Sequence, residues 1–361
     1  MTFKKKNITI ILSIITSLIG ILIAVTYGVV LPQIHNSNNN GIITSFSNNL
    51  NNTRSVHIRT SLNQVGIWQS AMVDETGYEQ VNQTAISKFE NNAGKKLALV
   101  VFSNEWYNGI SFPNSMANIV KQNNAVPIIR MAPWQNNGQS LSDAGPYTVS
   151  NIAMGQQDTA LKKWAKAAKT FGSTILVDFG YEPNNDEFPW SKQGPVTYIA
   201  AYRHIVTIFR QQHANNVYFV YHPDMGSTPD NMRQWYPGDP YVDWILASAY
   251  GEDGNIGTLG VLNNSYHNLT AISLSKPLGI EEWGIGSSTD TKNTLNALAQ
   301  NKFPRIRILS VWNEGPAGGI DRRIEQSPEM LNAYKAGIAN SFYLSSNFNP
   351  TPAVQTANKS H

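Results

Sequence analysis

The 361-residue sequence contains no cysteine. Disulfide frameworks, thiol nucleophiles and cysteine-ligated zinc sites are therefore excluded. The sequence also has little excess charge, because its formal net charge of +3 equals the contribution of Lys4, Lys5 and Lys6. The remainder is neutral and has no cluster of Lys and Arg. Nucleic-acid binding depends on neutralising phosphates, so we expect no nucleic-acid partner.

Several motifs of other enzyme classes are missing as well. The sequence has no HExxH, no GxSxG and no complete P-loop, and its seven histidines show no metal-ligand spacing. The loop Gly251–Asn255 has residues that could coordinate calcium, but a solvated turn is the simpler interpretation. We expect no metal and no cofactor. His222 alone is placed for catalysis or substrate contact, although a lone histidine is more often a hydrogen-bonded structural residue.

The first 32 residues contain a long apolar segment. Residues 8–31 carry no charge and follow the three lysines, and as a helix they would span about 36 Å, enough to cross a bilayer. The positive-inside rule places the lysines in the cytoplasm and the body outside the cell. A cleaved signal peptide, and hence a secreted protein, is the alternative. Because signal-peptide cores are shorter and Ala24–Gly28 is a poor cleavage site, we expect a single-pass cell-membrane anchor over residues 1–32 with an extracellular body.

Composition divides the rest of the chain into three parts. Residues 33–55 are rich in Asn and Ser without helical or strand periodicity, which is typical of a flexible spacer. Residues 56–344 form the expected catalytic domain. Residues 345–361 are polar and predict a disordered tail.

Short apolar runs alternate with segments of helical periodicity throughout residues 56–344, which indicates repeated βα units and a parallel sheet. Between residues 198 and 209, and again between 160 and 168, apolar residues recur on one helical face. No glycine-rich phosphate fingerprint follows the first strand. The pattern therefore predicts an α/β fold, a (β/α)8 TIM barrel, rather than an open sheet. The eight expected strands are residues 66–68, 97–102, 126–131, 175–179, 217–221, 244–250, 278–281 and 306–312.

Acidic residues follow two of these strands. Glu182 comes shortly after the fourth strand, and Glu281 and Glu282 end the seventh. In a TIM barrel the active site forms at the carboxyl ends of the strands. Glycosidic bond cleavage needs two facing carboxyl groups, one to protonate the leaving oxygen and one to attack or stabilise the oxocarbenium-like centre. Either glutamate alone could simply accept backbone hydrogen bonds, but the pair favours a glycosidase.

Tryptophans gather near the same strand ends. Sugars present apolar C–H faces that stack on indole rings, so a cluster at one barrel face indicates carbohydrate binding. Each ring could equally be core or rim packing, and for Trp164, on the apolar face of a helix, core packing is the better interpretation. The six at or just past strand ends are Trp68, Trp106, Trp134, Trp190, Trp283 and Trp312.

From about residue 65 to 340 the sequence resembles glycoside hydrolase family 26, whose known members are mainly β-mannanases. Collinear segments carry the resemblance, and no single motif would be as specific. They are residues 89–106, 126–134, 152–158 with Trp164-Ala165, 182–185 with Pro189-Trp190, 235–244, and 276–284.

The resemblance implies roles for individual residues. The glutamate followed two residues later by Asn is the family's acid/base, which corresponds to Glu182. The glutamate before an aromatic-Gly pair is its nucleophile, which corresponds to Glu282 rather than Glu281. If strand alternation holds, Ile280 and Leu278 also face the barrel interior, and Glu281 faces the helices. The substrate-binding residues we expect are Tyr250, Trp312, Trp190, Trp134, Trp106, Asn184, Trp283 and His222.

Two positions depart from the family pattern. The family usually has His immediately before the acid/base and Arg four residues before it, whereas this chain has Tyr181 and Asp178. Alternation points Asp178 in the same direction as Glu182, where a second carboxylate would disfavour ionisation of its neighbours. Asp178 must therefore be protonated or paired. We expect its partner to be an arginine from another strand, such as Arg130 or Arg307.

The sequence leaves two functions open. The first is a retaining endo-glycosidase acting on a polysaccharide, with β-mannan ranked first and mixed-linkage β-glucan or β-1,3-xylan as alternatives. The second is a surface carbohydrate-binding protein that has lost turnover, which would fit the two departures. Apart from the polysaccharide and the membrane, no partner is implied.

Overall fold

The computed structural model describes most of the chain after residue 65. The expected anchor over residues 1–32, the spacer 33–55 and the loop 251–255 lie outside the described residues, so these stay predictions. Among the residues that are described, no helix has the length and apolarity needed to cross a membrane. The described residues are 66–74, 80–107, 109–134, 145–226, 230–250, 257–315, 321–352 and 354.

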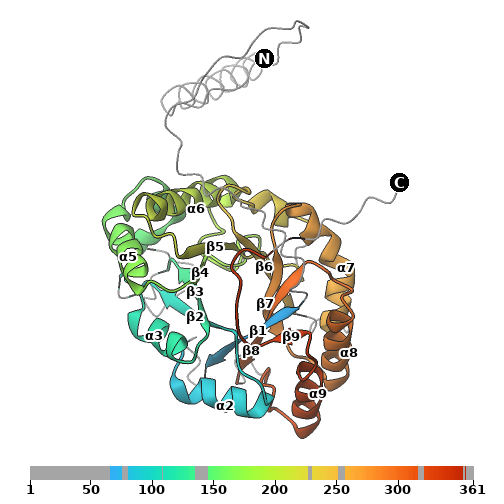
Figure 1. Cartoon of the computed structure of the whole chain (residues 1–361). Helices are drawn as coiled ribbons and strands as arrows, with labels where there is room; N and C mark the ends of the chain where they lie inside the picture. Colours follow the sequence, from blue (N-terminus) through green and yellow to red (C-terminus); the bar gives the residue numbers. More distant parts are fainter. Residues whose placement is uncertain are drawn as a thin grey trace, which may run out of the picture. The chain divides into compact units, whose positions relative to one another are not determined.

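Eight parallel strands close into a barrel, which confirms the predicted fold. The hydrogen-bonded order runs from β2 through β8 to β1, and pairing of β1 with β2 closes the ring (Figure 1). All eight predicted strands are present, three of them with the predicted bounds. The strands are β1 (Ile67–Asp74), β2 (Leu99–Glu105), β3 (Val126–Ala132), β4 (Ile175–Phe179), β5 (Val217–Tyr221), β6 (Trp244–Tyr250), β7 (Leu278–Gly284) and β8 (Ile306–Glu314).

Helices surround the strands in Figure 1. The two helical periodicities seen in the sequence correspond to α5 and α6, whose buried residues include Trp164 and Tyr202. In the part of the chain that the structure describes, β5 and β6 are joined by a short 3-10 helix, η2 (Met232–Trp235). The α-helices are α2 (Gln83–Ala93), α3 (Asn114–Gln122), α4 (Val149–Ala153), α5 (Asp158–Phe171), α6 (Gly194–Gln211), α7 (Gly257–Ile272), α8 (Ser288–Ala299) and α9 (Pro328–Ile338), with a second 3-10 helix, η1 (Gly145–Tyr147), before α4.

Strand alternation divides the apolar core into two clusters. An inner cluster inside the barrel includes Ile128, Leu176 and Ile308, whereas an outer cluster packs between the strands and the helices. Arg130 and Asp178 share the inward parity of Ile128 and Leu176 and are register neighbours on β3 and β4. The barrel interior therefore carries charged side chains above its apolar base.

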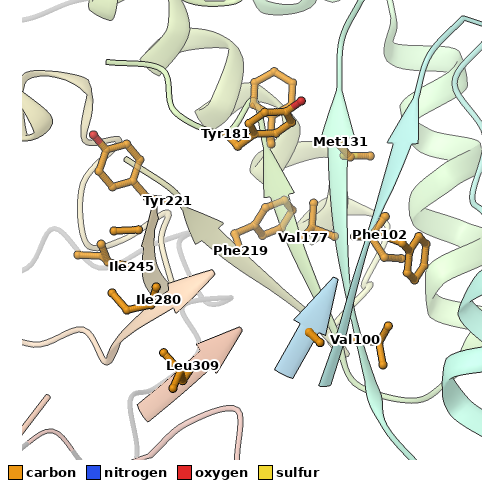
Figure 2. Packing of buried hydrophobic residues seen from close by; sticks show 14 of the residues in the cluster. Val100, Phe102, Met131, Val177, Tyr181, Phe219, Tyr221, Ile245, Ile280 and Leu309 are labelled. Carbon is orange, nitrogen blue, oxygen red and sulfur yellow. The ribbon is translucent and has the colours of Figure 1, made fainter. Parts of the chain in front are cut away.

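The expected direction of the β7 side chains is wrong. Leu278 and Ile280 belong to the outer cluster, where Figure 2 shows Ile280 with Ile245 and Leu309 of the neighbouring strands. The inner position is Gly279, whose added Cβ would lie 2.7 Å from Leu246 Cδ2 and 2.9 Å from Ile308 Cβ.

A register irregularity then changes the parity of β7. Ala247 pairs with Ile280, yet the next residue of β6, Ser248, pairs with Glu282. One extra residue on β7 therefore stands opposite β6, as in a β-bulge. Glu281 and Glu282 consequently both face the barrel interior, and the prediction that Glu281 faces the helices is also wrong.

Part of the segment assigned to the polar tail packs against the barrel. A short strand, β9 (Tyr343–Leu344), pairs with the start of β1. Beyond it, the Phe348 ring lies 5.0 Å from Trp68 and 5.6 Å from Trp244, and Trp244 Nε1 donates a hydrogen bond to Pro350 O at 2.9 Å. Trp68, which the sequence placed among the tryptophans near strand ends, is thus part of this packing at the amino end of β1.

Candidate active site

Glu182 stands on a strained turn after β4. Its φ angle is +48°, in the left-handed region that non-glycine residues seldom adopt. The Glu182 amide donates a hydrogen bond of 2.6 Å to His222 O, which ties this turn to the end of β5. Such strain persists where surrounding contacts impose it, and it is commonest at functional sites. The turn holds the carboxyl group at the carboxyl end of the barrel.

The surroundings of Glu182 favour its protonated form. Burial, together with the nearby charges of Glu282 and Asp224, raises the pKa of Glu182 to about 8. Asn185 Nδ2 lies 3.3 Å from Glu182 Oε2, and the Ser248 hydroxyl also hydrogen-bonds the carboxyl group. Near neutral pH, Glu182 therefore holds a proton that it can donate.

Asn184, expected to bind substrate, instead joins two loops. Its Nδ2 donates to Asp224 O at 2.7 Å, and its Oδ1 accepts from Asp224 N at 2.9 Å. Both ends of the amide are thus used by the backbone of the loop after β5. Asn184 positions Asp224, one of the charges that raise the pKa of Glu182.

Glu282 is surrounded by groups that stabilise a negative charge. Arg130 Nη2 forms an ion pair with Glu282 Oε1, and the Tyr250 hydroxyl donates a hydrogen bond to Oε2. A cation and a hydroxyl thus contact the two oxygens of one carboxyl group. The residue predicted to be the nucleophile is therefore held in a fixed orientation at the barrel mouth.

Glu281 lies beneath Glu282 and shares the same arginine. Arg130 Nε donates to Glu281 Oε1 at 3.1 Å, and His222 Nδ1 lies 3.6 Å from Glu281 Oε2. Burial opposes ionisation of Glu281, but the charges of His222 and Arg130 outweigh it and lower the pKa. Arg130 thus bridges two adjacent carboxylates.

Asp178 is paired, as expected, but its direct partner is a histidine. His222 Nδ1 lies 2.8 Å from Asp178 Oδ2, and His222 Nε2 lies 2.8 Å from Ser248 Oγ. Burial and the charge of Glu281 raise the pKa of Asp178. Burial alone would lower the pKa of His222, but Glu281 and Asp178 raise it well above its usual value.

The two arginines expected near Asp178 differ in their placement. Arg130 belongs to the network, and its charge acts on Asp178 to favour the carboxylate. Arg307 has the outward parity of β8 and donates to the backbone oxygen of Ile306. Arg307 is therefore not the partner.

The two glutamates predicted to be catalytic lie close together. One carboxyl oxygen of Glu182, one of Glu282 and a ring nitrogen of His222 all lie within 4.8 Å of one another, as do ligand atoms of Asp178, His222 and Glu281. Either set could in principle hold a cation. However, Arg130 already brings positive charge to Glu281 and Glu282, and both His222 nitrogens have hydrogen-bond partners. We interpret both groups as hydrogen-bonded charge networks.

Three of the predicted aromatic residues are partly exposed at the barrel mouth. Tyr250 and Trp312 contact each other edge to face with ring centroids 6.4 Å apart, next to Glu282. Trp134 follows β3 and contacts Tyr107 and Phe188. These rings have surface available for a sugar.

Three other predicted aromatic residues are buried. Trp106, Trp190 and Trp283 are at most 1% exposed and belong to the outer cluster. The indole N–H groups of Trp190 and Trp283 donate to Tyr181 O and Thr258 Oγ1. A ring buried on both faces leaves no surface for a sugar, so we assign these three to packing.

Ser248 and Asp224 were not singled out from the sequence. Ser248 lies between inward-facing Leu246 and Tyr250 on β6, so alternation could have identified it as a polar residue inside the barrel. Asp224 had no such signal, because it becomes part of the site only through its contacts with Asn184 and its bridge to Ser248.

Comparisons with known proteins point to one family of glycoside hydrolases. Residues 152–313, which include both Glu182 and Glu282, match the model of glycosyl hydrolase family 26. The chain is 29% identical to endoglucanase H of Acetivibrio thermocellus over 72% of its length, and 30% identical over 40% of its length to mannan endo-1,4-beta-mannosidase A and B of Caldalkalibacillus mannanilyticus. It spans only 29% and 28% of those two relatives.

Solved structures show the same fold. A modular endo-beta-1,4-mannanase from Cellulomonas fimi superposes with a TM-score of 0.61 at 17% identity, covering 81% of this chain and 75% of that one. A beta-mannanase from a symbiotic protist of the termite Reticulitermes speratus gives 0.57 at 18% identity, covering 78% and 89%. The resemblance to glycoside hydrolase family 26 predicted from the sequence is confirmed.

Proposed function

We propose that this family 26 barrel is a retaining glycoside hydrolase that cleaves internal β-glycosidic bonds of a polysaccharide. One observation carries the proposal: Glu182 and Glu282 lie with carboxyl oxygens within 4.8 Å of each other, Glu182 in surroundings that raise its pKa and Glu282 in an ion pair with Arg130. Retaining pairs stand about 5 to 5.5 Å apart, whereas inverting pairs need roughly 6.5 to 9.5 Å to admit a water molecule. The short separation supports the retaining mechanism.

Each residue of the site has a role in this mechanism. Glu182 protonates the departing glycosidic oxygen while Glu282 attacks the anomeric carbon, which gives a covalent glycosyl-enzyme. Glu182, now ionised, then takes a proton from the water that hydrolyses this intermediate. Arg130 and Tyr250 hold the Glu282 carboxylate, and Tyr250, Trp312 and Trp134 offer ring surface to the sugars.

The substrate we rank first is β-mannan, since a relative with 30% identity is named as a mannosidase. A β-glucan is the second candidate, because the relative named endoglucanase H is similar over a larger share of this chain. The test is release of reducing sugar by purified residues 54–361 from mannan, lichenan, laminarin and β-1,3-xylan. Cleavage of mannan alone supports the first choice, and cleavage of lichenan alone the second.

The roles of the two glutamates are tested with an aryl glycoside that has a good leaving group. Such a substrate needs little protonation, so Glu182→Gln should still form the glycosyl-enzyme and accumulate it. Glu282→Gln should lose that step altogether. The reverse result would exchange the two roles.

A carbohydrate-binding protein without turnover is the competing function. Tyr181 and Asp178 depart from the family pattern, which favours this alternative, but binding alone requires neither catalytic glutamate. If the same polypeptide binds one of the polysaccharides and releases no sugar from any of the four, the binding function replaces the enzymatic one.

We also propose that the barrel acts outside the cell, attached by the apolar segment 8–31 behind three lysines. Protease treatment of intact cells tests this location. Loss of the barrel from the cell surface supports it, whereas full protection would contradict it. Release of the barrel into the medium with its amino terminus cleaved would indicate secretion instead.

A further inference from the structure

Glu281 is a second buried carboxylate directly beneath the proposed nucleophile. It is 1% exposed and lies below the mouth of the barrel, where it has no access to a sugar. The bulge in β7 nevertheless turns it into the interior beside Glu282. A buried carboxylate is costly unless it is paired, so its retention inside the barrel requires an explanation.

One set of contacts connects Glu281 to the nucleophile. Arg130 Nε donates to Glu281 Oε1 at 3.1 Å, while Nη2 of the same guanidinium forms the ion pair with Glu282 Oε1. The arginine also lies over the rings of Tyr181 and Trp312, at 4.6 and 5.4 Å from their centroids. Glu281 therefore fixes the orientation in which the planar guanidinium meets Glu282.

A second set of contacts leads to the acid/base. His222 Nδ1 lies 3.6 Å from Glu281 Oε2 and 2.8 Å from Asp178 Oδ2. Its Nε2 is 2.8 Å from Ser248 Oγ, and the Ser248 hydroxyl hydrogen-bonds the Glu182 carboxyl group. Glu281 and Asp178 together hold the imidazole ring in the orientation that reaches Ser248.

We propose that Glu281 is a positioning residue of the glycosidase, which acts through Arg130 on Glu282 and through His222 and Ser248 on Glu182. This inference rests on the proposed function. It differs from a purely structural ion pair because one carboxylate contacts both cations, and each cation leads to a different catalytic glutamate. Loss of the Glu281 charge should consequently impair both halves of the reaction.

The central variant is Glu281→Gln, which keeps the shape and removes the charge. On an activated aryl glycoside its kcat should fall on the order of 100-fold, with a smaller change in KM, because a nucleophile displaced by about 1 Å loses this much. Glu329→Gln, the same change at an exposed position in α9, is the matched control and should keep both values.

Two further variants separate the two sets of contacts. Ser248→Ala removes the hydroxyl that links His222 to Glu182 and leaves the contacts of Arg130 with Glu282 in place, so it should slow hydrolysis of the polysaccharide more than that of the aryl glycoside. Arg130→Lys keeps the positive charge but lacks the planar guanidinium that contacts both Glu281 and Glu282. It should therefore slow hydrolysis of both substrates. These variants keep the test informative if Glu281→Gln does not fold.

The inference is overturned if Glu281→Gln folds and its kcat on both substrates lies within about twofold of the kcat of Glu329→Gln. Equal losses of rate on both substrates for Ser248→Ala would also overturn it.

A readout without turnover is the ring ¹⁵N NMR titration of His222, which faces Glu281, Asp178, Ser248 and the nearby charges of Arg130 and Glu182. Glu281→Gln should lower its titration midpoint. If the wild type cleaves nothing, the proposed function fails, while this titration still tests the network.

Discussion

At the scale of single residues, two chemically identical side chains have different neighbours. Glu182 meets burial and two carboxylates, which raise its pKa, whereas Glu282 meets a guanidinium and a phenol hydroxyl. Arg130 contacts Glu282 directly, but the structure shows no hydrogen bond from it to Glu182 among the described residues. The proposed division into acid and nucleophile therefore rests on which strand ends each glutamate faces.

The raised pKa of Glu182 predicts the pH dependence of activity. The proton needed for the first step is present below the pKa of about 8 and is lost above it. We expect kcat/KM on the polysaccharide to fall as the pH rises through about 8, while an aryl glycoside with a good leaving group declines less. Rate profiles from pH 4 to 10 measure this difference. A basic limb centred below pH 6 would contradict the assignment of Glu182.

The same pKa predicts an effect on stability. The folded state binds the Glu182 proton up to about pH 8, whereas an unfolded glutamate, at its ordinary pKa of 4.5, releases it much earlier. Wild-type stability from this group is therefore complete below about pH 4.5 and decreases as the pH rises through 8. Glu182→Gln does not titrate, so its melting temperature should exceed that of the wild type by several degrees at pH 9 and by less at pH 5. A difference that is constant with pH would argue against the raised pKa.

That the two candidate glutamates meet at the barrel mouth could be predicted from the sequence, but the network around them only in part. Strand ends and motif context predicted Glu182 and Glu282 as the candidates. Asp178 was expected to be protonated or paired, and charge considerations suggested Arg130 or Arg307, of which only Arg130 belongs to the network. The link through His222 depends on side chains from β4, β5 and β7 meeting inside a closed barrel, which spacing along one strand does not reveal. Burial of Trp106 and Trp283 likewise depends on how helices cover the strands.

At the scale of secondary structure, an irregularity in β7 brings two glutamates into the site. Its pairing with β6 shifts by one residue between Ile280 and Glu282, which places two consecutive glutamates on the inner face. Alternation assumes regular pairing, so the sequence could not show this shift. The strand predicted for β1, residues 66–68, is shorter than the observed Ile67–Asp74 because polar residues interrupt its pattern. Gln69 and Ser70 interrupt its apolar run, although both are fully buried in the barrel wall.

At Gly279, side chains of both neighbouring strands lie close to the β7 backbone. A methyl group there would lie 2.7 Å from Leu246 Cδ2 and 3.0 Å from Ile308 O, and the backbone oxygen cannot easily move. We expect Gly279→Ala to lower the free energy of unfolding by about 1–3 kcal/mol, through overpacking. Urea denaturation followed by tryptophan fluorescence measures this.

The matched control for Gly279→Ala is Gly315→Ala, where the nearest atom would be Arg323 Nε at 3.9 Å. Its stability should stay within about 0.5 kcal/mol of the wild type. Because Gly279 precedes the bulge, its substitution should also reduce kcat by displacing Glu281 and Glu282. Unchanged stability and kcat in Gly279→Ala would show that the β7 backbone can move away without cost.

At the scale of the barrel domain, the sequence was sufficient to predict the architecture. It did not predict that the segment after residue 344 packs against the amino end of the barrel. Eight apolar runs with helical segments between them specified the barrel, since each run is buried on both faces. Polar composition suggested that the chain was unstructured after residue 344. Phe348 is a single apolar residue among polar neighbours, so the sequence did not indicate that it packs. Its burial depends on Trp68 and Trp244, which it contacts at the amino end of the barrel.

The packing of Phe348 at the amino end of the barrel predicts a substitution that lowers stability and leaves activity unchanged. Phe348 is half-buried against two tryptophans of the inner cluster, while the proposed catalytic glutamates lie at the opposite end of the strands. Phe348→Ala should therefore cost about 1–2 kcal/mol of stability through lost aromatic contacts, and it should leave kcat at 25 °C unchanged. Leu274→Ala, a truncation of a side chain that is 78% exposed, is the matched control and should change neither. Thermal unfolding and the hydrolysis rate, measured on the same samples, decide the outcome. A loss of activity without a loss of stability would mean that the carboxyl-terminal segment influences the active site through the strands rather than closing the base of the barrel.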